Sequence, residues 1–389
     1  MKEGYRLLGD FIRQVDVRNT DGKEENLLGV SVQKMFIPSI ANTVGTDFTK
    51  YKVVKRGQFT YIPDTSRRGD KIGIALLTDY DEGLVSNIYT VFEVKDENEL
   101  LPEYLMLWFS RPEFDRYARF KSHGSVREIM DWDEMCKVEL PVPSIEKQRS
   151  IVKAYNTITD RIELKRKIND NLEATAQAVF QEQFASFYGA SELPDGYRII
   201  NLDNLCTVKG GKRLPADCKL LDTPTDHPYI RVRDVGSNRY VYLTNQFQYI
   251  DEETYSAISR YIVNTGDIVI SIVGTIGLLG KIHSSLNKAN LTENCVRLAN
   301  IHTVTSDYLY YTLCYKKQIK EINLLTVGAV QAKLPMYNIQ SMKILVPSTK
   351  VIEAFQRKMN VLNEQIEANT VEIQKLYELE DVLLAKLSD

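Results

Sequence analysis

The chain repeats itself at a fixed offset of 204 residues. Leu-Pro-Val-Pro-Ser at 140–144 returns as Ile-Leu-Val-Pro-Ser at 344–348, and the offset then holds without a gap along the helical segment that follows. It also holds upstream, where Gly-Ser-Val at 124–126 returns as Gly-Ala-Val at 328–330. A two-fold repeat predicts two similar heads and two similar helices, because a repeat array would need three or more units.

Composition is that of an ordinary globular protein. Of 389 residues, 43% are hydrophobic and 26% charged, which allows two or three domains. The sequence has no apolar run of about 18 residues and no apolar signal core near Met1, so no membrane partner is expected. The five cysteines form no CxxC pair and are odd in number, which favours a reducing, cytoplasmic location.

The charge balance restricts how the chain could bind nucleic acid. The formal net charge is −3 at pH 7, whereas a nucleic-acid-binding domain is usually basic as a whole. Any DNA contact must therefore come from local basic loops on a mildly acidic body, or be shared with a basic partner.

Two long segments carry a helical pattern, the first from Ser144 to about Phe187 and the second from about Thr349 to Leu387. Apolar residues recur at alternating steps of four and three, which predicts the seam of a coiled coil. Lys165 and Asn169 interrupt the seam, and polar residues there can fix register and partner choice. The predicted seam and partner positions are Ile151, Tyr155, Ile158, Ile162, Leu172, Phe355, Met359, Leu362, Ile366, Leu376 and Leu383.

A helix of about 38 residues is roughly 57 Å long, which is too long for its own head to bury. The two helices should therefore pair with each other, antiparallel, with one head at each end. The predicted fold class is α+β, with two similar mixed α/β heads joined by a two-helix coiled coil in a pseudo-two-fold dumbbell. The predicted domains are a first head at 1–143, a helix at 144–188, a second head at 189–347 and a helix at 348–389.

Catalytic motifs are missing from the sequence. It has no HExxH, no GxSxG and no Walker phosphate loop. The nearest approach, Gly274 to Lys281, lacks the first glycine of a phosphate loop, and its glycines favour a turn between two strands. The four histidines match no metal-ligand spacing. The chain is predicted to be non-catalytic, with no metal and no cofactor of its own.

Basic residues do gather in loops of both halves. Glycine beside arginine lets the backbone approach a phosphate, and arginine can also bind a guanine edge with two hydrogen bonds. A solvated charged loop is the alternative for each cluster taken alone, but their occurrence in both halves favours DNA. The predicted DNA-binding residues are Arg67, Arg68, Lys71, Lys212, Arg213, Arg231 and Arg233.

Several stretches resemble the specificity subunit of Type I restriction-modification enzymes, over essentially the whole chain. They are Gly266-Asp267-Ile268-Val269-Ile270-Ser271 running into Gly274-Thr275-Ile276-Gly277, Gly211-Lys212-Arg213-Leu214-Pro215 followed by Pro228-Tyr229-Ile230-Arg231-Val232, Leu140-Pro141-Val142-Pro143 with Glu146-Lys147-Gln148, and Gly-Ala-Val-Gln at 328–331. The first head departs from the pattern, because it lacks the Gly-Lys-Arg-Leu-Pro stretch and its glycine turn at 69–73 is one residue longer.

The resemblance implies a non-catalytic reader of double-stranded DNA. Each head would be a target recognition domain for one half of a bipartite, asymmetric site. The helix pair would set the spacing and dock two modification subunits. Those subunits would carry S-adenosylmethionine and methylate adenine, while restriction subunits of a full complex would use ATP with Mg.

A second interpretation stays open from the residues alone. A protein–protein scaffold could bridge two partners without touching DNA, and the acidic balance and missing catalytic groups allow it. A gel shift of the purified complex on random genomic fragments would separate these two classes. Arg67→Ala with Arg68→Ala is expected to weaken binding and to flatten its salt dependence, because fewer counterions are released.

Overall fold

The computed structural model describes residues 4–39, 45–65, 71–122, 128–236, 239–244, 246–328 and 332–388. The chain divides into two compact units. Unit 1 comprises Met1–Leu164 and Lys375–Asp389, and unit 2 comprises Lys165–Gln374. Each unit therefore contains one head and a part of both long helices, and each is described by itself.

The head of unit 1 is a mixed α/β fold whose strands are short. Its strands are β1 (Tyr5–Leu7), β2 (Ile12–Val15), β3 (Leu28–Val30), β4 (Phe36–Pro38), β5 (Lys52–Lys55), β6 (Phe59–Tyr61), β7 (Ile74–Leu76), β8 (Glu82–Val85), β9 (Thr90–Val94) and β10 (Glu139–Pro141). Its helices are α1 (Pro102–Ser110), α2 (Pro112–Lys121) and α3 (Trp132–Cys136), and the first long helix is α4 (Ile145–Phe184). The main sheet is antiparallel in the order β2-β9-β6-β7.

Aromatic residues build the core of this head, because β6 and β9 carry them on the face that meets α1. The rings of Phe59 and Phe92 stack with centroids 4.8 Å apart, and Phe109 of α1 meets Phe59 edge-on at 5.8 Å. All three side chains are fully buried. Pro102 begins α1 in its first turn, where the missing N–H costs nothing.

The head of unit 2 repeats this plan with extra elements. Its strands are β11 (Arg198–Asn201), β12 (Thr207–Gly210), β13 (Pro228–Ile230), β14 (Tyr240–Val241), β15 (Gln248–Tyr249), β16 (Ile268–Ser271), β17 (Leu279–Ile282), β18 (Asn290–Leu291), β19 (Cys295–Ala299) and β20 (Lys343–Val346). Its helices are α5 (Glu252–Ile258), α6 (Ser306–Cys314), α7 (Lys316–Leu324) and α8 (Met336–Gln340), and the second long helix is α9 (Thr349–Ala385). The five-stranded sheet runs β12-β19-β16-β17-β14, and a three-stranded sheet runs β15-β13-β18.

Four elements of each head keep the repeat offset in the structure, and we call them the framework. Helices α1, α2 and α3 correspond to α6, α7 and α8 at the offset of 204, and β10 corresponds to β20. The main sheets share one strand order, since β2-β9-β6-β7 matches β12-β19-β16-β17. The heads therefore share a scaffold even upstream, where the sequence offset fails, and they differ in the segments inserted between its strands.

Residue identity alone would misalign the first strands of the two heads by two residues. Tyr-Arg at 5–6 echoes Tyr-Arg at 197–198 at an offset of 192, but the backbone pairing differs. The amide of Leu8 bonds Val138 O at 2.8 Å, and the amide of Leu202 bonds Met342 O at 3.0 Å. Since Val138 and Met342 are framework equivalents, Leu8 corresponds to Leu202. Both leucines are fully buried, so the buried leucine that follows each strand, rather than residue identity, marks the equivalent positions.

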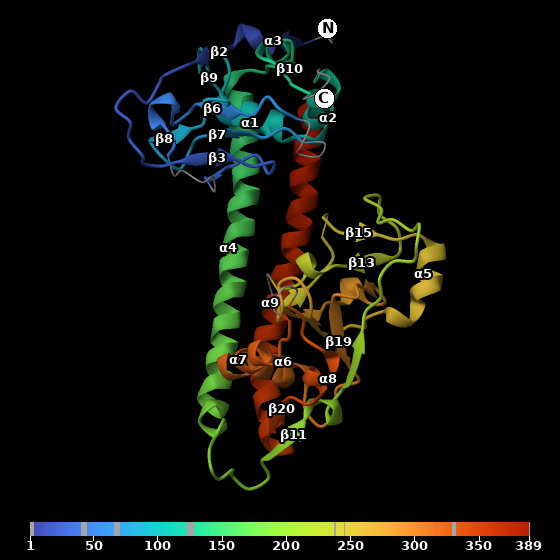
Figure 1. The fold of residues 1–389 in the computed structure, drawn as a ribbon. Coiled ribbons are helices and arrows are strands. Elements are labelled where there is room, and N and C mark those ends of the chain that lie inside the picture. Colours follow the sequence, from blue (N-terminus) through green and yellow to red (C-terminus); the bar gives the residue numbers. More distant parts are fainter. Residues whose placement is uncertain are drawn as a thin grey trace. The chain divides into compact units, whose positions relative to one another are not determined.

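The two long helices, green and red in Figure 1, run antiparallel within each unit. In unit 1, the Tyr155 hydroxyl donates to Oε1 of Glu380 at 2.6 Å. In unit 2, the rings of Phe180 and Phe355 lie 6.0 Å apart. Among the predicted seam residues, Ile162, Phe355, Met359, Ile366 and Leu376 are buried and the other six are half-buried. The predicted fold class, two mixed α/β heads with two long paired helices, is confirmed.

Candidate nucleic-acid interface

Two of the predicted DNA-binding residues, Arg67 and Arg68, lie outside the described residues. Lys71 follows them and is exposed. The next amide, Ile72 N, donates to Oδ1 of Asp115 at 3.1 Å. This carboxylate fixes the backbone next to Lys71 to α2.

Asp115, which accepts from the Ile72 amide, also forms a buried ion pair with Lys34. Its Oδ1 lies 2.5 Å from Nζ of Lys34, and both side chains are about nine-tenths buried. The Lys34 ammonium also donates to Ile72 O at 2.8 Å. Burial lowers the pKa of Lys34, and the nearby Asp115 opposes that shift. A paired buried charge therefore holds Ile72, the residue next to Lys71, on both its N–H and its carbonyl side.

In the second head, Lys212 and Arg213 extend from a loop that is pinned by close backbone contact. A Cβ on Gly211 would lie 2.0 Å from the carbonyl oxygen of Thr292, so only glycine fits. The amide of Lys212 donates to Leu291 O at 2.8 Å. Both basic side chains are exposed. The backbone is therefore fixed while the two cations stay in solvent.

Arg213 is highly accessible to solvent. Its side chain is 82% exposed, and its Nε lies 2.7 Å from Oε1 of Glu293. Burial alone would raise the pKa of Glu293, but hydrogen bonds from Arg213, the backbone and Thr292 outweigh burial and lower it. An exposed ion pair of this kind contributes little stability, so Arg213 can exchange Glu293 for a phosphate at small cost.

Arg231 and Arg233 follow β13 and face different environments. Nη2 of Arg231 lies 2.8 Å from Oδ1 of Asp234, with both side chains largely buried, and it also bonds Gln246 O at 3.1 Å. Arg233 is exposed. The structure therefore gives Arg231 a role in holding its turn, and it leaves Arg233 as the accessible cation of this cluster.

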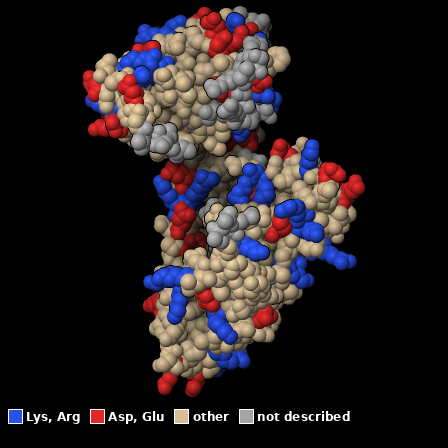
Figure 2. All heavy atoms as spheres, viewed as in Figure 1, with Lys and Arg blue, Asp and Glu red and all other residues tan. Residues whose placement is uncertain are grey.

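The fold brings the two basic clusters of the second head onto one small sheet. The hydroxyl of Tyr229 in β13 donates to Lys212 O at 2.7 Å. Strand β18, which ends at Leu291, pairs in parallel with β13. In Figure 2, basic and acidic side chains are interspersed on the visible face of each unit. The positive charge of this sheet thus comes from its local loops. That these residues contact DNA stays a prediction.

A buried charged cluster ties the second head to the long helices, and sequence reasoning missed it. Its centre is Arg239, which comes just before β14 and bonds Asp307 of α6. The guanidinium also donates to Oδ1 of Asn363 in α9 at 2.5 Å and lies 3.6 Å from Oε1 of Glu173 in α4. The side chains of Arg239 and Asp307 are 1% and 4% exposed.

Asp307 receives several donors at once. Nζ of Lys281 lies 2.6 Å from its Oδ1, and Nε2 of Gln356 donates to its Oδ2 at 2.6 Å. Burial alone would raise the pKa of Asp307, but Lys281, Arg239 and the amide of Gln356 lower it to about 2. The cluster joins a variable segment of the head to the shared framework. It therefore fixes how this segment of the head is held relative to the helices within unit 2.

Neither a metal site nor a membrane span is found in the part of the chain that the structure describes. Those residues hold no group of three or more His, Cys, Asp or Glu side chains that could bind a metal ion. All five cysteines are free thiols. No described helix combines the length and the apolar character needed to cross a membrane.

Comparison with known proteins gives one family. The model described as "Type I restriction modification DNA specificity domain" matches residues 11–174 and again residues 194–380. The Type I restriction enzyme HindI specificity subunit of Haemophilus influenzae is 22% identical, over 98% of this chain and 97% of that protein. The MjaIX specificity subunit of Methanocaldococcus jannaschii is 23% identical, over 74% of this chain and 68% of that protein.

Solved structures of the same kind are also similar. The crystal structure of a Type I restriction-modification S subunit from M. genitalium matches with a TM-score of 0.48 and 16% identity, covering 99% of this chain and 96% of that one. A chain from a Type I assembly matches with a TM-score of 0.45 and 17% identity, covering 100% and 98%.

Proposed function

Since the chain belongs to the Type I restriction-modification DNA specificity family, we propose that each of its heads reads one half of a bipartite, asymmetric DNA site. The observation that carries this proposal is a shared scaffold with different loops. Helices α1 to α3 and strand β10 return as α6 to α8 and β20 at a constant offset, and the main sheets share one strand order. The segments between the sheet strands differ in length and charge. Different loops on one scaffold suit two different half-sites.

The long helices act as a ruler in this proposal. Helices α4 and α9 contain 40 and 37 residues, or roughly 60 and 55 Å at 1.5 Å per residue. A duplex rises about 3.4 Å per base pair, so such a bar corresponds to at most about 17 base pairs. Half-sites about one helical turn apart would also lie on one face of the DNA.

The chain itself carries no reaction in this proposal. Two modification subunits dock on the helix pair and the heads, bind S-adenosylmethionine and methylate adenine. Restriction subunits of a full complex use ATP with Mg. The motif-poor sequence and the lack of a metal cluster in the described residues are compatible with this division, and methyl transfer by the purified chain alone would contradict it.

A length change tests the ruler directly. Inserting one heptad into each of α4 and α9 adds about 10.5 Å, or roughly three base pairs. The methylated motif should keep both half-sites and gain about three unread positions between them. An unchanged spacer in a folded, active complex would refute the ruler. Replacing one head with that of another family member should change only one half-site.

A further inference from the structure

An arginine and a glutamate of the second head form an ion pair on its surface. Nε of Arg213 donates to Oε1 of Glu293 at 2.7 Å. The Arg213 side chain is 82% exposed and that of Glu293 is 30% exposed. The bond at Nε fixes the plane of the guanidinium. Its Nη atoms hydrogen-bond to no residue that the structure describes, so the outer edge of the guanidinium stays available as a donor.

Both members of the pair are carried by backbone that is held in place. The pair joins the loop after β12 to the turn between β18 and β19. Gly211 packs so closely against the carbonyl of Thr292 that no side chain fits there, and the amide of Lys212 bonds Leu291 O at 2.8 Å. The hydroxyl of Thr292 also donates to Oε2 of Glu293 at 3.0 Å. The two charged side chains are therefore positioned before any ligand binds.

Glu293 keeps both its negative charge and its capacity to accept a further hydrogen bond. Burial alone would raise the pKa of Glu293, but the hydrogen bonds that it accepts lower it. An ionised carboxylate offers about four lone-pair sites. Arg213 and Thr292 use one site on each oxygen, so Glu293 can bind another donor without releasing the arginine.

The first head places a different exposed side chain at the position of this arginine. In the first head, Val15 pairs with Val91. In the second, the amide of Gly211 bonds Cys295 O at 3.0 Å, and Cys295 lies 204 residues beyond Val91. Val15 therefore corresponds to Gly211, and Val17, which is 46% exposed, corresponds to the arginine. One scaffold position that presents an arginine in one head and a valine in the other suits the reading of two different half-sites.

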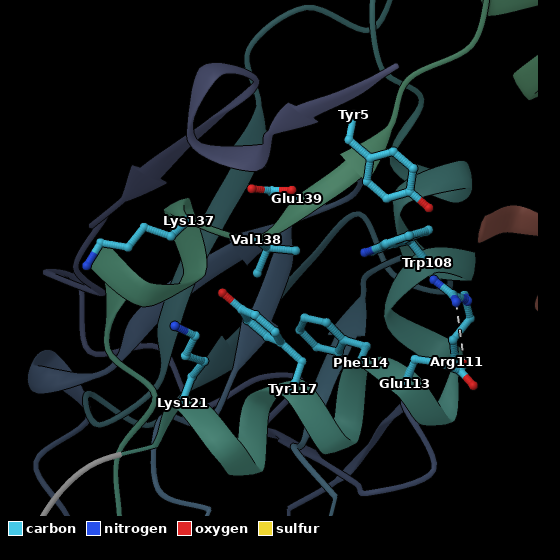
Figure 3. Close-up of a pocket in the computed structure, with 10 residues that line it drawn as sticks. All are labelled: Tyr5, Trp108, Arg111, Glu113, Phe114, Tyr117, Lys121, Lys137, Val138 and Glu139. Carbon is cyan, nitrogen blue, oxygen red and sulfur yellow. Dashed lines mark ion pairs between the residues drawn. The ribbon is translucent and has the colours of Figure 1, made fainter. Parts of the chain in front are cut away.

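Other arginines of the two heads are not presented in this way. Figure 3 shows Arg111 between Trp108 and Glu113. Its guanidinium lies 4.1 Å from the centre of the Trp108 ring, and its side chain is only 5% exposed. Arg231 is likewise largely buried in its own ion pair. Arg213 differs because it combines a fixed plane with an accessible outer edge.

We propose that Arg213 and Glu293 together read one G·C base pair in the half-site of the second head, with the guanidinium bound to guanine and the carboxylate bound to cytosine. The proposal rests on the proposed function, since it takes DNA as the ligand of this head. In the major groove, guanine presents the acceptors O6 and N7, which match two N–H donors of one arginine. Cytosine presents the donor N4 of its amino group, which a glutamate can accept.

Neighbouring side chains of opposite charge suit the neighbouring edges of one base pair. Reading guanine with the Nη edge keeps the bond from Nε to Glu293 intact, whereas a phosphate on Nε would have to replace it. A carboxylate beside a phosphate contact would also repel the DNA. The place of Glu293 next to Arg213 therefore favours a base over a phosphate as the ligand of the arginine.

Methylation of a random-sequence DNA library by the assembled complex tests this proposal. The chain is combined with modification subunits, and the methylated molecules are sequenced. The wild type should require a G·C pair at one position of one half-site. Glu293→Gln and, separately, Arg213→Ala should each relax discrimination at that same position by about tenfold. Both variants should fold, because an exposed ion pair contributes little stability.

The first head supplies a matched control. Nε of Arg13 donates to Oε1 of Glu93 at 2.8 Å, and Glu93 lies in β9 of the main sheet. Glu93→Gln removes the same charge from the same kind of ion pair. It should leave every position of the methylated motif unchanged.

Three results would overturn the reading of a base pair. An unchanged motif, with Arg213→Ala binding all sequences more weakly and Glu293→Gln binding all of them more tightly, would assign the arginine to a phosphate. Relaxation at two different positions would show that the two residues do not share a base pair. Relaxation at a position that holds no G·C pair would refute the assignment of the bases. A wild-type complex that selects no bipartite motif would instead contradict the proposed function.

Discussion

Lys165 and Asn369 occupy the same position in the two repeats, and they are bonded to each other. Nζ of Lys165 donates to Oδ1 of Asn369 at 2.9 Å. When two repeated helices pair antiparallel, a residue contacts its equivalent in the other repeat only where the pseudo-two-fold axis passes through the pair. Asn369 also donates to Oδ1 of Asn169 at 2.8 Å, and Lys165 pairs with Glu372 at 2.9 Å. Polar residues therefore mark the centre of the helix pair, where they can fix its register.

Replacing Asn369 with alanine should expose the cost of this polar centre. Lys165 and Asn169 would each lose a partner, and an unsatisfied buried polar group costs about 1–3 kcal/mol. The loss should appear in the free energy of unfolding measured with urea. Glu364→Ala, an exposed position on α9, is the matched control. Equal stability of the two variants would mean that the polar centre stabilises nothing.

Arg239→Met should be among the most destabilising substitutions in unit 2. It removes one partner of a buried ion pair, which costs about 3–5 kcal/mol. Arg13→Met breaks the ion pair with Glu93, in which the arginine side chain is 63% exposed, and should cost less than about 1 kcal/mol. Denaturant titration of both variants checks the difference. A cost for Arg239→Met as small as that of Arg13→Met would contradict the structural role of the cluster.

The same cluster predicts an acid-sensitive component of stability. The pKa of Asp307 is lowered from 3.8 to about 2. A carboxyl with a depressed pKa contributes stability that is present above its unfolded pKa and is lost as the pH falls through its folded pKa. The contribution should be constant above about pH 4 and disappear towards pH 2. Asp307→Asn should remove it, so wild type and variant should converge in stability at low pH. Parallel curves would refute this assignment.

Gly211→Ala should disable the basic loop of the second head. Its Cβ would lie 2.0 Å from the Thr292 carbonyl oxygen and 2.4 Å from that of Leu291, so the backbone that carries Lys212 must move. DNA binding by the assembled complex should weaken. Gly210→Ala is a close control, because its Cβ would meet nothing within 4 Å. Similar affinities for the two variants would separate this loop from DNA binding.

Lys212→Ala with Arg213→Ala should lower the salt dependence of DNA binding. Each phosphate contact contributes about 0.9 to the slope of log K against log salt, so the slope should fall by up to about 1.8. Arg357→Ala, on the exposed side of α9, should leave it unchanged. A slope that the double variant does not alter would remove both residues from the DNA contacts.

Much of the fold could be predicted from the sequence, because the repeat constrains both halves at once. The gapless offset predicted equivalent helices, and the spacing of residues such as Phe355 and Met359 predicted the seam. The offset of the N-terminal strand could not be predicted, because the identical Tyr-Arg pairs do not show which side chains are buried. The buried residues Leu8 and Leu202 mark the equivalent positions of the two heads.

The charged cluster around Arg239 could not be predicted. Its members come from separate parts of the chain, with Arg239 and Asp307 68 residues apart, and each is an ordinary polar residue in its local context. No spacing rule links them until the head has folded onto the helices. The basic loops could be recognised in the sequence, but the ion pairs that their arginines form within the protein could not. Arg231, which looks like a DNA contact beside Arg233, is held by Asp234.

The central claim is that this chain selects the DNA site of a methyltransferase complex. The most direct test is methylome sequencing of the host with and without its gene, and with the gene restored. A bipartite, adenine-methylated motif should disappear on deletion and return on restoration. If no such motif is lost, the chain does not select a methylation site, and the account given for its heads fails.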